Sequence, residues 1–268
     1  MRIKTLYAFI TKPPFAVTIF IALVLIIPII VYQFIPRVPQ SSSYHHFADI
    51  RKIWGIPNFW NVISNIPFLL VSILGFVSIQ KQRKSNNLAA KEAIVFLIIF
   101  IGVLFTSFGS AYYHWFPNND SLVWDRIPIT IVFMSLLSLT IMERINFNVG
   151  FGLLLPLIAV GTFSVVYWHW TELSGQGDIR LYGLVQFYSI FLIVLILFLF
   201  PKPYPPLKIY IGMFVFYILA KIFEYFDFMI DGLISGHTLK HLCAAVSACF
   251  IVTMLNARQT IQSTTNNS

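Results

Sequence analysis

The composition of this chain places it in a membrane. Its 268 residues are 58% hydrophobic and 17% aromatic but only 10% charged, and a mean hydropathy of +0.80 excludes a water-soluble domain of this size. The net charge of +8 would indicate nucleic-acid binding in a soluble protein. Here the basic residues lie at the ends of apolar runs and indicate membrane topology, so no nucleic-acid partner is expected.

Uncharged apolar runs long enough to cross a bilayer of about 30 Å as helices recur along the whole chain. Strand-like alternation is absent, which favours an all-α polytopic membrane bundle over a barrel. We predict eight transmembrane helices, near residues 14–34, 58–79, 93–115, 125–142, 148–168, 181–200, 207–227 and 236–256. The seventh is the least apolar because Lys221, Glu224 and Asp227 lie in its second half, and without it the count is seven.

The first predicted span resembles a signal peptide, because an apolar core follows the basic residues Arg2, Lys4 and Lys12. Its uncharged stretch, however, runs from Pro13 to Pro36 and ends in "PRVPQSSS", without an A-x-A cleavage site. We therefore expect an uncleaved membrane anchor.

Basic residues collect on one side of the predicted topology. With eight helices and the N-terminus inside, that side holds Arg2, Lys4, Lys12, Lys81, Arg83, Lys84, Lys91, Lys202, Lys208 and Arg258. The opposite side holds mostly carboxylates, at Asp120, Asp125, Glu172, Asp178, Asp227 and Asp231, apart from the bases Arg37, Arg51 and Lys52. The positive-inside rule therefore predicts both termini in the cytoplasm. All six histidines then fall at the outer level, at His45, His46, His114, His169, His237 and His241.

Three separate stretches meet at that outer level. The third predicted helix ends in "GSAYYHW", with Ser110 and His114; the fourth begins with "LVWDRIP", with Asp125; the last begins with "SGHTLKHL", with His237 and His241. Positions i and i+4 lie about 6 Å apart on one face of a helix, so each of the two spaced pairs points one way. The sequence thus delivers a serine, an aspartate and three histidines to one depth.

Three imidazoles with an open fourth position are typical of catalytic zinc, since a structural zinc site has four protein ligands. Zinc lowers the pKa of water in the open position to about 7 and polarises a bound carbonyl. Asp125 can accept a proton from the attacking water or hydrogen-bond a ligand histidine, and Ser110 can donate to the oxyanion formed from a carbonyl.

Structural interpretations compete with each of these roles. An H-x-x-x-H pair alone is a weak motif, Ser110 alone is typical of helix packing, and the aromatic residues around it fit an interfacial belt. His45, His46 and His169 have the character of ordinary interface residues. In the seventh span, Lys221 and Glu224 have the i,i+3 spacing of an ion pair. Asp227 could cap a helix end or face water. This patch can also support the site without supplying ligands.

The order S-x-x-x-H, then D, then H-x-x-x-H resembles the CREST superfamily of membrane hydrolases, and most closely its alkaline ceramidase branch. "GSAYYH", "WDRIPI" and "SGHTLKHL" are similar to the three site segments of that family, and "FWNVISNIPF" at residues 59–68 to its first-helix signature. The resemblance extends over about residues 44–256. It implies zinc on His114, His237 and His241, catalytic support from Ser110 and Asp125, and hydrolysis of the amide bond of ceramide-like lipids.

The resemblance also implies an organisation of the chain. Residues 1–40 would form a cytoplasmic segment and an extra transmembrane helix, residues 41–257 a seven-helix hydrolase domain, and residues 258–268 a short polar tail. Characterised eukaryotic members have several acidic residues before the "FWN" segment for calcium. This chain has only Asp49 there, which argues against calcium control.

Two other functions remain open at this point. Receptor-like members of the same superfamily share the serine, aspartate and histidine positions, although the short tail favours an enzyme. A transporter with a polar relay is the third possibility, but the halves of the chain show no clear repeat. The sequence predicts an integral membrane protein with its active-site end on the periplasmic or lumenal side, and no particular oligomeric state.

Overall fold

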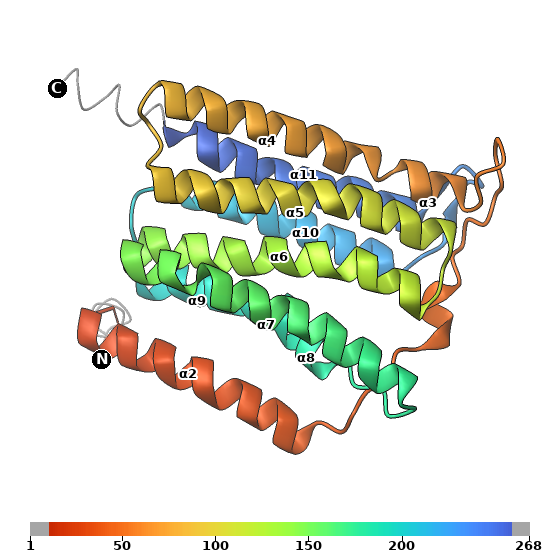
Figure 1. Cartoon of the computed structure of the whole chain (residues 1–268), viewed down its shortest axis with the longest axis horizontal. Helices are drawn as coiled ribbons and strands as arrows, with labels where there is room; N and C mark the ends of the chain where they lie inside the picture. Colours follow the sequence, from red (N-terminus) through yellow and green to blue (C-terminus); the bar gives the residue numbers. More distant parts are fainter. Residues whose placement is uncertain (1–10, 259–268) are drawn as a thin grey trace. The chain divides into compact units, whose positions relative to one another are not determined.

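The computed structural model describes residues 11–258. The basic positions Arg2 and Lys4, and the predicted polar tail beyond residue 258, lie outside the described residues. The helices, in chain order, are α2 (Pro13–Phe34), η1 (Ser42–His45), α3 (Phe59–Ile63), α4 (Ile66–Lys84), α5 (Ala90–Trp115), α6 (Asn119–Arg144), α7 (Phe147–Leu173), α8 (Arg180–Gly183), η2 (Leu184–Tyr188), α9 (Ser189–Leu199), α10 (Leu207–Tyr225) and α11 (Gly236–Asn256) (Figure 1).

The all-α polytopic bundle predicted from the sequence is confirmed. Within the described residues, seven helical segments are long and apolar enough to cross a membrane: Pro14–Phe34, Phe59–Lys84, Ala90–Trp115, Asn119–Arg144, Phe147–Leu173, Arg180–Leu199 and Gly236–Asn256. The protein is therefore an integral, multi-pass membrane protein. The remaining predicted span is the helix α10, which contains Lys208, Lys221 and Glu224 and is not among the seven.

Two helix ends differ from the sequence prediction for local reasons. α6 begins at Asn119 instead of near residue 125, because the Asn118 side chain accepts a hydrogen bond from the Ser121 amide at 2.8 Å and caps the first turn. α7 continues to Leu173 and ends where Gly175 takes a φ of +70°, the left-handed conformation that glycine adopts most readily.

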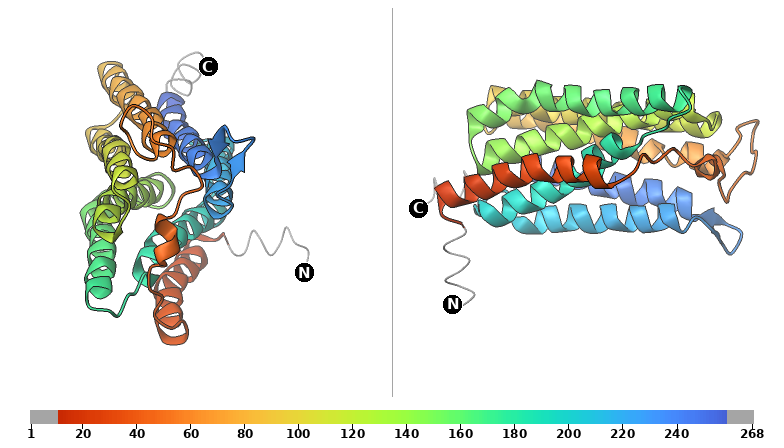
Figure 2. Two further views of the ribbon diagram at one scale, coloured as in Figure 1. Left: turned by 90° about the vertical axis from the view of Figure 1, so that its right-hand side faces the viewer. Right: turned by 90° about the horizontal axis from the view of Figure 1, so that it is seen from below.

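The described chain forms two compact units. Unit 2 comprises residues 41–132 and 205–258. In it α4 packs against α5 and α11, and α11 packs along α10 (Figure 1, Figure 2). Its interior contains fully buried aromatic and aliphatic side chains from several helices, including Phe96 and Phe100 on α5, Tyr210 on α10 and Leu255 on α11.

Unit 1 comprises residues 11–40 and 133–204 and contains the extra N-terminal helix α2. α2 packs against α9, while most of its apolar side chains remain exposed, as expected for a surface that faces lipid. The C-terminal end of α2 is attached by Arg180, whose guanidinium donates to the carbonyls of Tyr32 and Ile35. The same guanidinium forms an ion pair with Asp178 at 2.7 Å.

The second predicted span is broken between α3 and α4. Pro67 has no backbone N–H, so an unbroken helix would lack a hydrogen bond at this point. The break falls at Ser64 and Asn65, and both side chains are buried in unit 2. At the break the backbone carbonyl of Asn65 accepts a hydrogen bond from the Ser107 hydroxyl on α5 at 3.1 Å.

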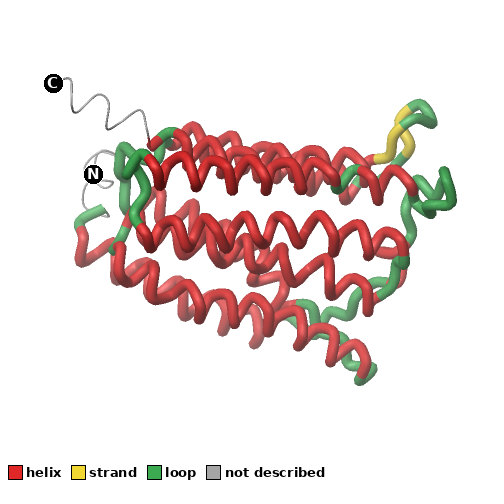
Figure 3. Tube along the Cα trace, turned by 45° about the horizontal axis from the view of Figure 1, so that its top comes forward, coloured by secondary structure: helices red, strands yellow, loops and turns green. Residues whose placement is uncertain are grey.

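A short hairpin joins α10 to α11. The strands β1 (Met229–Ile230) and β2 (Ile234–Ser235) pair antiparallel and are drawn in yellow in Figure 3. Three residues connect them, and the first two, Asp231 and Gly232, have φ values of +48° and +67°, as the central residues of an Asp-Gly turn require. Strands of two residues are too short to show an alternating pattern, so the sequence did not predict them.

Candidate metal centre

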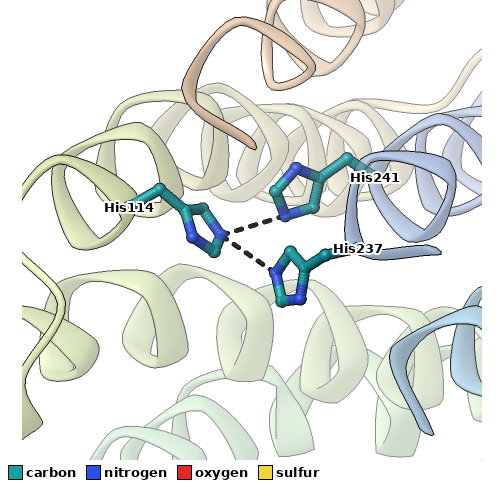
Figure 4. A group of neighbouring side chains, drawn as sticks. All are labelled: His114, His237 and His241. Carbon is teal, nitrogen blue, oxygen red and sulfur yellow. Dashed lines mark hydrogen bonds between the residues drawn. The ribbon is translucent and has the colours of Figure 1, made fainter. Parts of the chain in front are cut away.

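Three buried histidines converge at one end of unit 2. His114 comes from the last turn of α5, and His237 and His241 come from the first two turns of α11 (Figure 4). The Nε2 atom of His114 lies 3.1 Å from Nε2 of His241 and 3.2 Å from Nε2 of His237. The three side chains could hold a metal ion, since one ligand atom from each lies within 4.8 Å of the others.

Neighbouring groups orient two of these imidazoles. The Ser64 hydroxyl donates to the Asn61 carbonyl at 3.2 Å and lies 2.7 Å from Nδ1 of His241, so the Nδ1–H of His241 donates to Ser64 and its Nε2 keeps a free lone pair. Nε2 of His237 lies 3.1 Å from the Lys240 ammonium, which can only donate, so this nitrogen also presents a lone pair. Both lone pairs are on the nitrogens that face His114.

This arrangement fits a bound cation. Three nitrogens on one tetrahedral metal at zinc–nitrogen distances lie about 3.3 Å from one another, close to the two separations observed. Nδ1 of His114 is buried without a hydrogen-bond partner among the described residues, so Nε2 is the nitrogen of this ring that faces other groups. Three imidazoles without cysteine are the donor set of a catalytic rather than a structural metal site.

Ser110 and Asp125 lie where the backbones of α5 and α6 come close together. A Cβ atom on Gly109 would lie 2.0 Å from the carbonyl oxygen of Trp124, so the two backbones can touch only because residue 109 has no side chain. The next residue on each helix contributes to the site: the Ser110 hydroxyl lies near enough to the Asp125 carboxylate to interact with it, and both side chains are buried. The role of Gly109 could have been suspected from the small pair Gly-Ser near a helix end.

Lys240 joins these two parts of the site and was not singled out from the sequence. Its ammonium contacts Nε2 of His237, forms an ion pair with Glu224 at 3.0 Å and lies within electrostatic reach of Asp125. The available signal was an ionisable residue between two histidines of an otherwise apolar helix. Glu224 also pairs with Lys221, as the i,i+3 spacing predicted, and accepts a hydrogen bond from the Tyr44 hydroxyl at 3.0 Å.

Asp227 caps the helix that carries two of the histidines. Its Oδ1 accepts from the His237 amide at 2.8 Å, and its Oδ2 accepts from the Ala48 amide at 2.9 Å. The sequence left two roles open for Asp227, a helix cap or a solvent-facing side chain, and in the structure it caps α11. The Ser235 hydroxyl adds a second cap by accepting a hydrogen bond from the Thr238 amide at 3.0 Å. Two backbone amides in the first turn of α11 are therefore satisfied by side chains.

The segment before α3 covers the histidines. The Phe47 ring lies 4.8 Å from the rings of both His114 and His237, measured between ring centroids. Nearby, His45 contacts the Tyr113 hydroxyl through Nδ1 and the side-chain amide oxygen (Oδ1) of Asn119 through Nε2, both at 3.0 Å. Burial lowers the pKa of His45 below its ordinary 6.5, so the ring is neutral at pH 7, with Nε2–H donating and Nδ1 accepting.

The remaining candidates lie outside the three-histidine group. His46 follows η1 and is not in the group, and His169 lies on α7 in unit 1. Asp49 forms an ion pair with Arg51 at 2.5 Å. Burial would raise the pKa of Asp49, but hydrogen bonds from Arg51 lower it below its ordinary 3.8.

Comparison with known families agrees with this geometry. A sequence profile for the family described as Ceramidase matches residues 52–231, which is more than half of the chain. The chain belongs to the ceramidase family. Membership implies an amidohydrolase that acts on a lipid amide. The matched range includes Ser110, His114 and Asp125 and ends before His237. No curated protein and no solved structure matches the chain.

Proposed function

We propose that this ceramidase-family protein is a zinc-dependent hydrolase that cleaves the amide bond of a ceramide-like lipid within the membrane. The observation that carries the proposal is the convergence of three buried imidazoles beside a buried serine–aspartate pair. His114, His237 and His241 would hold the zinc ion. A zinc ion there would supply Lewis acidity, activating water and polarising the amide carbonyl.

The residues of the chain would carry the proton chemistry. Asp125 accepts a proton from the attacking water as the new carbon–oxygen bond forms and the carbonyl electron pair moves onto oxygen. It returns that proton to the amide nitrogen as the carbon–nitrogen bond breaks. One water and one amide thus give a fatty acid and a long-chain base.

Ser110 has two compatible tasks. Its hydroxyl lies near the Asp125 carboxylate and would hold it in place by donating a hydrogen bond. When the amide oxygen becomes negatively charged, the same hydroxyl can donate to it. Both tasks require Ser110 to stay within hydrogen-bond distance of its partners, which the short α5–α6 approach at Gly109 allows.

The proposal extends to domain boundaries and orientation. Residues 41–257 form the hydrolase domain, α2 is an additional anchor, and both termini face the cytoplasm. Lys81, Arg83 and Lys84 support this orientation, because they end α4, whereas the histidine group lies at the opposite helix ends of unit 2. The active site would then lie on the periplasmic or lumenal side.

The test is metal analysis combined with lipid hydrolysis. Full-length protein, purified in detergent, is expected to contain one zinc ion per chain and to release fatty acid from ceramide, as measured by mass spectrometry. His114→Ala and His241→Ala should lose both zinc and activity. His169→Ala, a matched histidine on α7, should retain both. Protein without zinc, in which the two site variants keep amidase activity, would refute the proposal.

A further inference from the structure

The Lys240 side chain stands out among the polar residues of unit 2, because it contacts a histidine of the metal centre without having a ligand's chemistry. Its ammonium lies 3.1 Å from Nε2 of His237 and has donors but no lone pair. Its side chain is only 15% exposed, so water solvates little of this charge. A buried cation beside three imidazoles that could bind another cation needs a physical explanation.

Glu224 explains how the charge is kept in place. The Glu224 carboxylate forms an ion pair with the Lys240 ammonium at 3.0 Å. The same carboxylate is held in place by an ion pair with Lys221 and by a hydrogen bond from the Tyr44 hydroxyl. Asp125 adds a second carboxylate within electrostatic reach of Lys240. The ammonium therefore contacts a carboxylate of α10 and a histidine of the candidate metal centre at the same time.

The contact with His237 indicates where the ammonium goes when a metal is bound. A single lone pair on Nε2 cannot bind both a metal and an N–H group. With a metal on Nε2, the ammonium would give up its contact with His237 and keep its ion pair with Glu224, with Asp125 still within electrostatic reach. It would thus remain next to the histidines that would hold the metal and to the proposed general base.

We propose that Lys240 is a further catalytic residue of this reaction, whose ammonium donates a hydrogen bond to the amide oxygen as that oxygen gains negative charge. This inference rests on the proposed function. As water adds, the carbonyl electron pair moves to oxygen, and the water proton passes to Asp125. Lys240 keeps its own protons and stabilises the oxyanion by charge and hydrogen bonding until the carbon–nitrogen bond breaks.

The same positive charge must weaken metal binding, because two cations in a buried site repel each other. Lys240 should therefore lower the metal affinity of the site, whereas a residue with a purely structural role would raise it. Removing the charge should strengthen zinc binding while slowing the reaction. Loss of a merely structural residue would weaken both.

The experiment compares Lys240→Met and Lys240→Gln with wild type in full-length protein. Zinc affinity is measured by chelator competition, and kcat and KM by ceramide hydrolysis. We expect both variants to bind zinc at least tenfold more tightly, to lose about 100-fold in kcat and to change little in KM. Glu224→Gln, which leaves the Lys240 charge uncompensated, should bind zinc more weakly. Lys208→Met, the same substitution at an exposed position on α10, is the control and should behave as wild type.

The outcomes separate this inference from the proposed function. A wild-type protein that contains no zinc and has no amidase activity would refute both the proposed function and the role of Lys240. If wild type contains zinc and has amidase activity, weaker or unchanged zinc binding in the two Lys240 variants would overturn the role of Lys240 alone, as would an unchanged kcat. Only tighter zinc binding together with a lower kcat supports it. Lys240→Arg, which keeps the charge, should retain wild-type zinc affinity and guards against a loss caused by misfolding.

Discussion

Gly109→Ala is the most sensitive test of how the helices position the site. The added Cβ would lie 2.0 Å from the Trp124 carbonyl oxygen, whereas a carbon–oxygen contact needs about 3.3 Å. The α5 and α6 backbones must therefore separate by about 1.3 Å at this point. Because the atom in the way is a backbone oxygen, a side-chain rotation cannot relieve the contact.

The consequence falls on the adjacent residues, Ser110 and Asp125. A hydrogen bond of ordinary length would be stretched by about 1 Å, past the limit at which it still contributes. Misplacement on this scale costs about 100-fold in rate, and overpacking costs about 1–3 kcal/mol of stability. We expect both losses in Gly109→Ala.

The assay measures ceramide hydrolysis and thermal unfolding of the variant in detergent. Gly152→Ala is the matched control, since a Cβ on this α7 glycine would meet nothing within 4 Å. An added methyl group there should leave activity unchanged and stabilise the helix by up to about 1 kcal/mol. If Gly109→Ala keeps activity within twofold of Gly152→Ala, the argument from close helix approach is wrong.

Three further predictions test other contacts. Ser64→Ala removes the acceptor for Nδ1 of His241 and should weaken zinc binding 10- to 100-fold in chelator competition, whereas unchanged affinity would show that Ser64 does not orient the ring. Asp227→Ala removes the side-chain cap of α11 and should lower the free energy of unfolding by about 1 kcal/mol, while a variant as stable as wild type would contradict the cap. Asp178 has a pKa below its ordinary 3.8, chiefly because Arg180 donates to it. Its stabilising effect is therefore present above pH 4 and lost as pH falls through its folded pKa, so Asp178→Asn should destabilise at pH 7 and lose this effect in acid; a constant difference in melting temperature would refute this.

The helical architecture could be read from the sequence because hydrocarbon imposes it. A chain that crosses a bilayer must satisfy its backbone hydrogen bonds within each segment, so long uncharged runs become helices whatever lies beside them. The span at 93–115 corresponds to α5 and that at 236–256 to α11, with the N-terminal end of α5 three residues earlier. Helix ends were predicted less well where a side chain such as Asn118 extends the helix by capping it.

The candidate metal ligands could also be proposed from the sequence, because topology limits depth. Ser110, His114 and Asp125 belong to consecutive predicted helices that meet at one end, and helical periodicity puts His237 and His241 on one face. These are local regularities, and they require no knowledge of which helices are neighbours.

Tertiary structure alone decided which groups touch. The contact between Ser64 and His241 joins residues 177 positions apart, and that between Lys240 and Glu224 joins two helices whose facing surfaces no periodicity specifies. Gly109 matters only because Trp124 lies against it. Backbone hydrogen bonding and bilayer thickness act within one segment, so the sequence determined the helices and the depth of the polar residues. Orientation of the imidazoles, placement of the lysine charge and the α5–α6 approach depend on packing between segments, and only the folded chain could decide them.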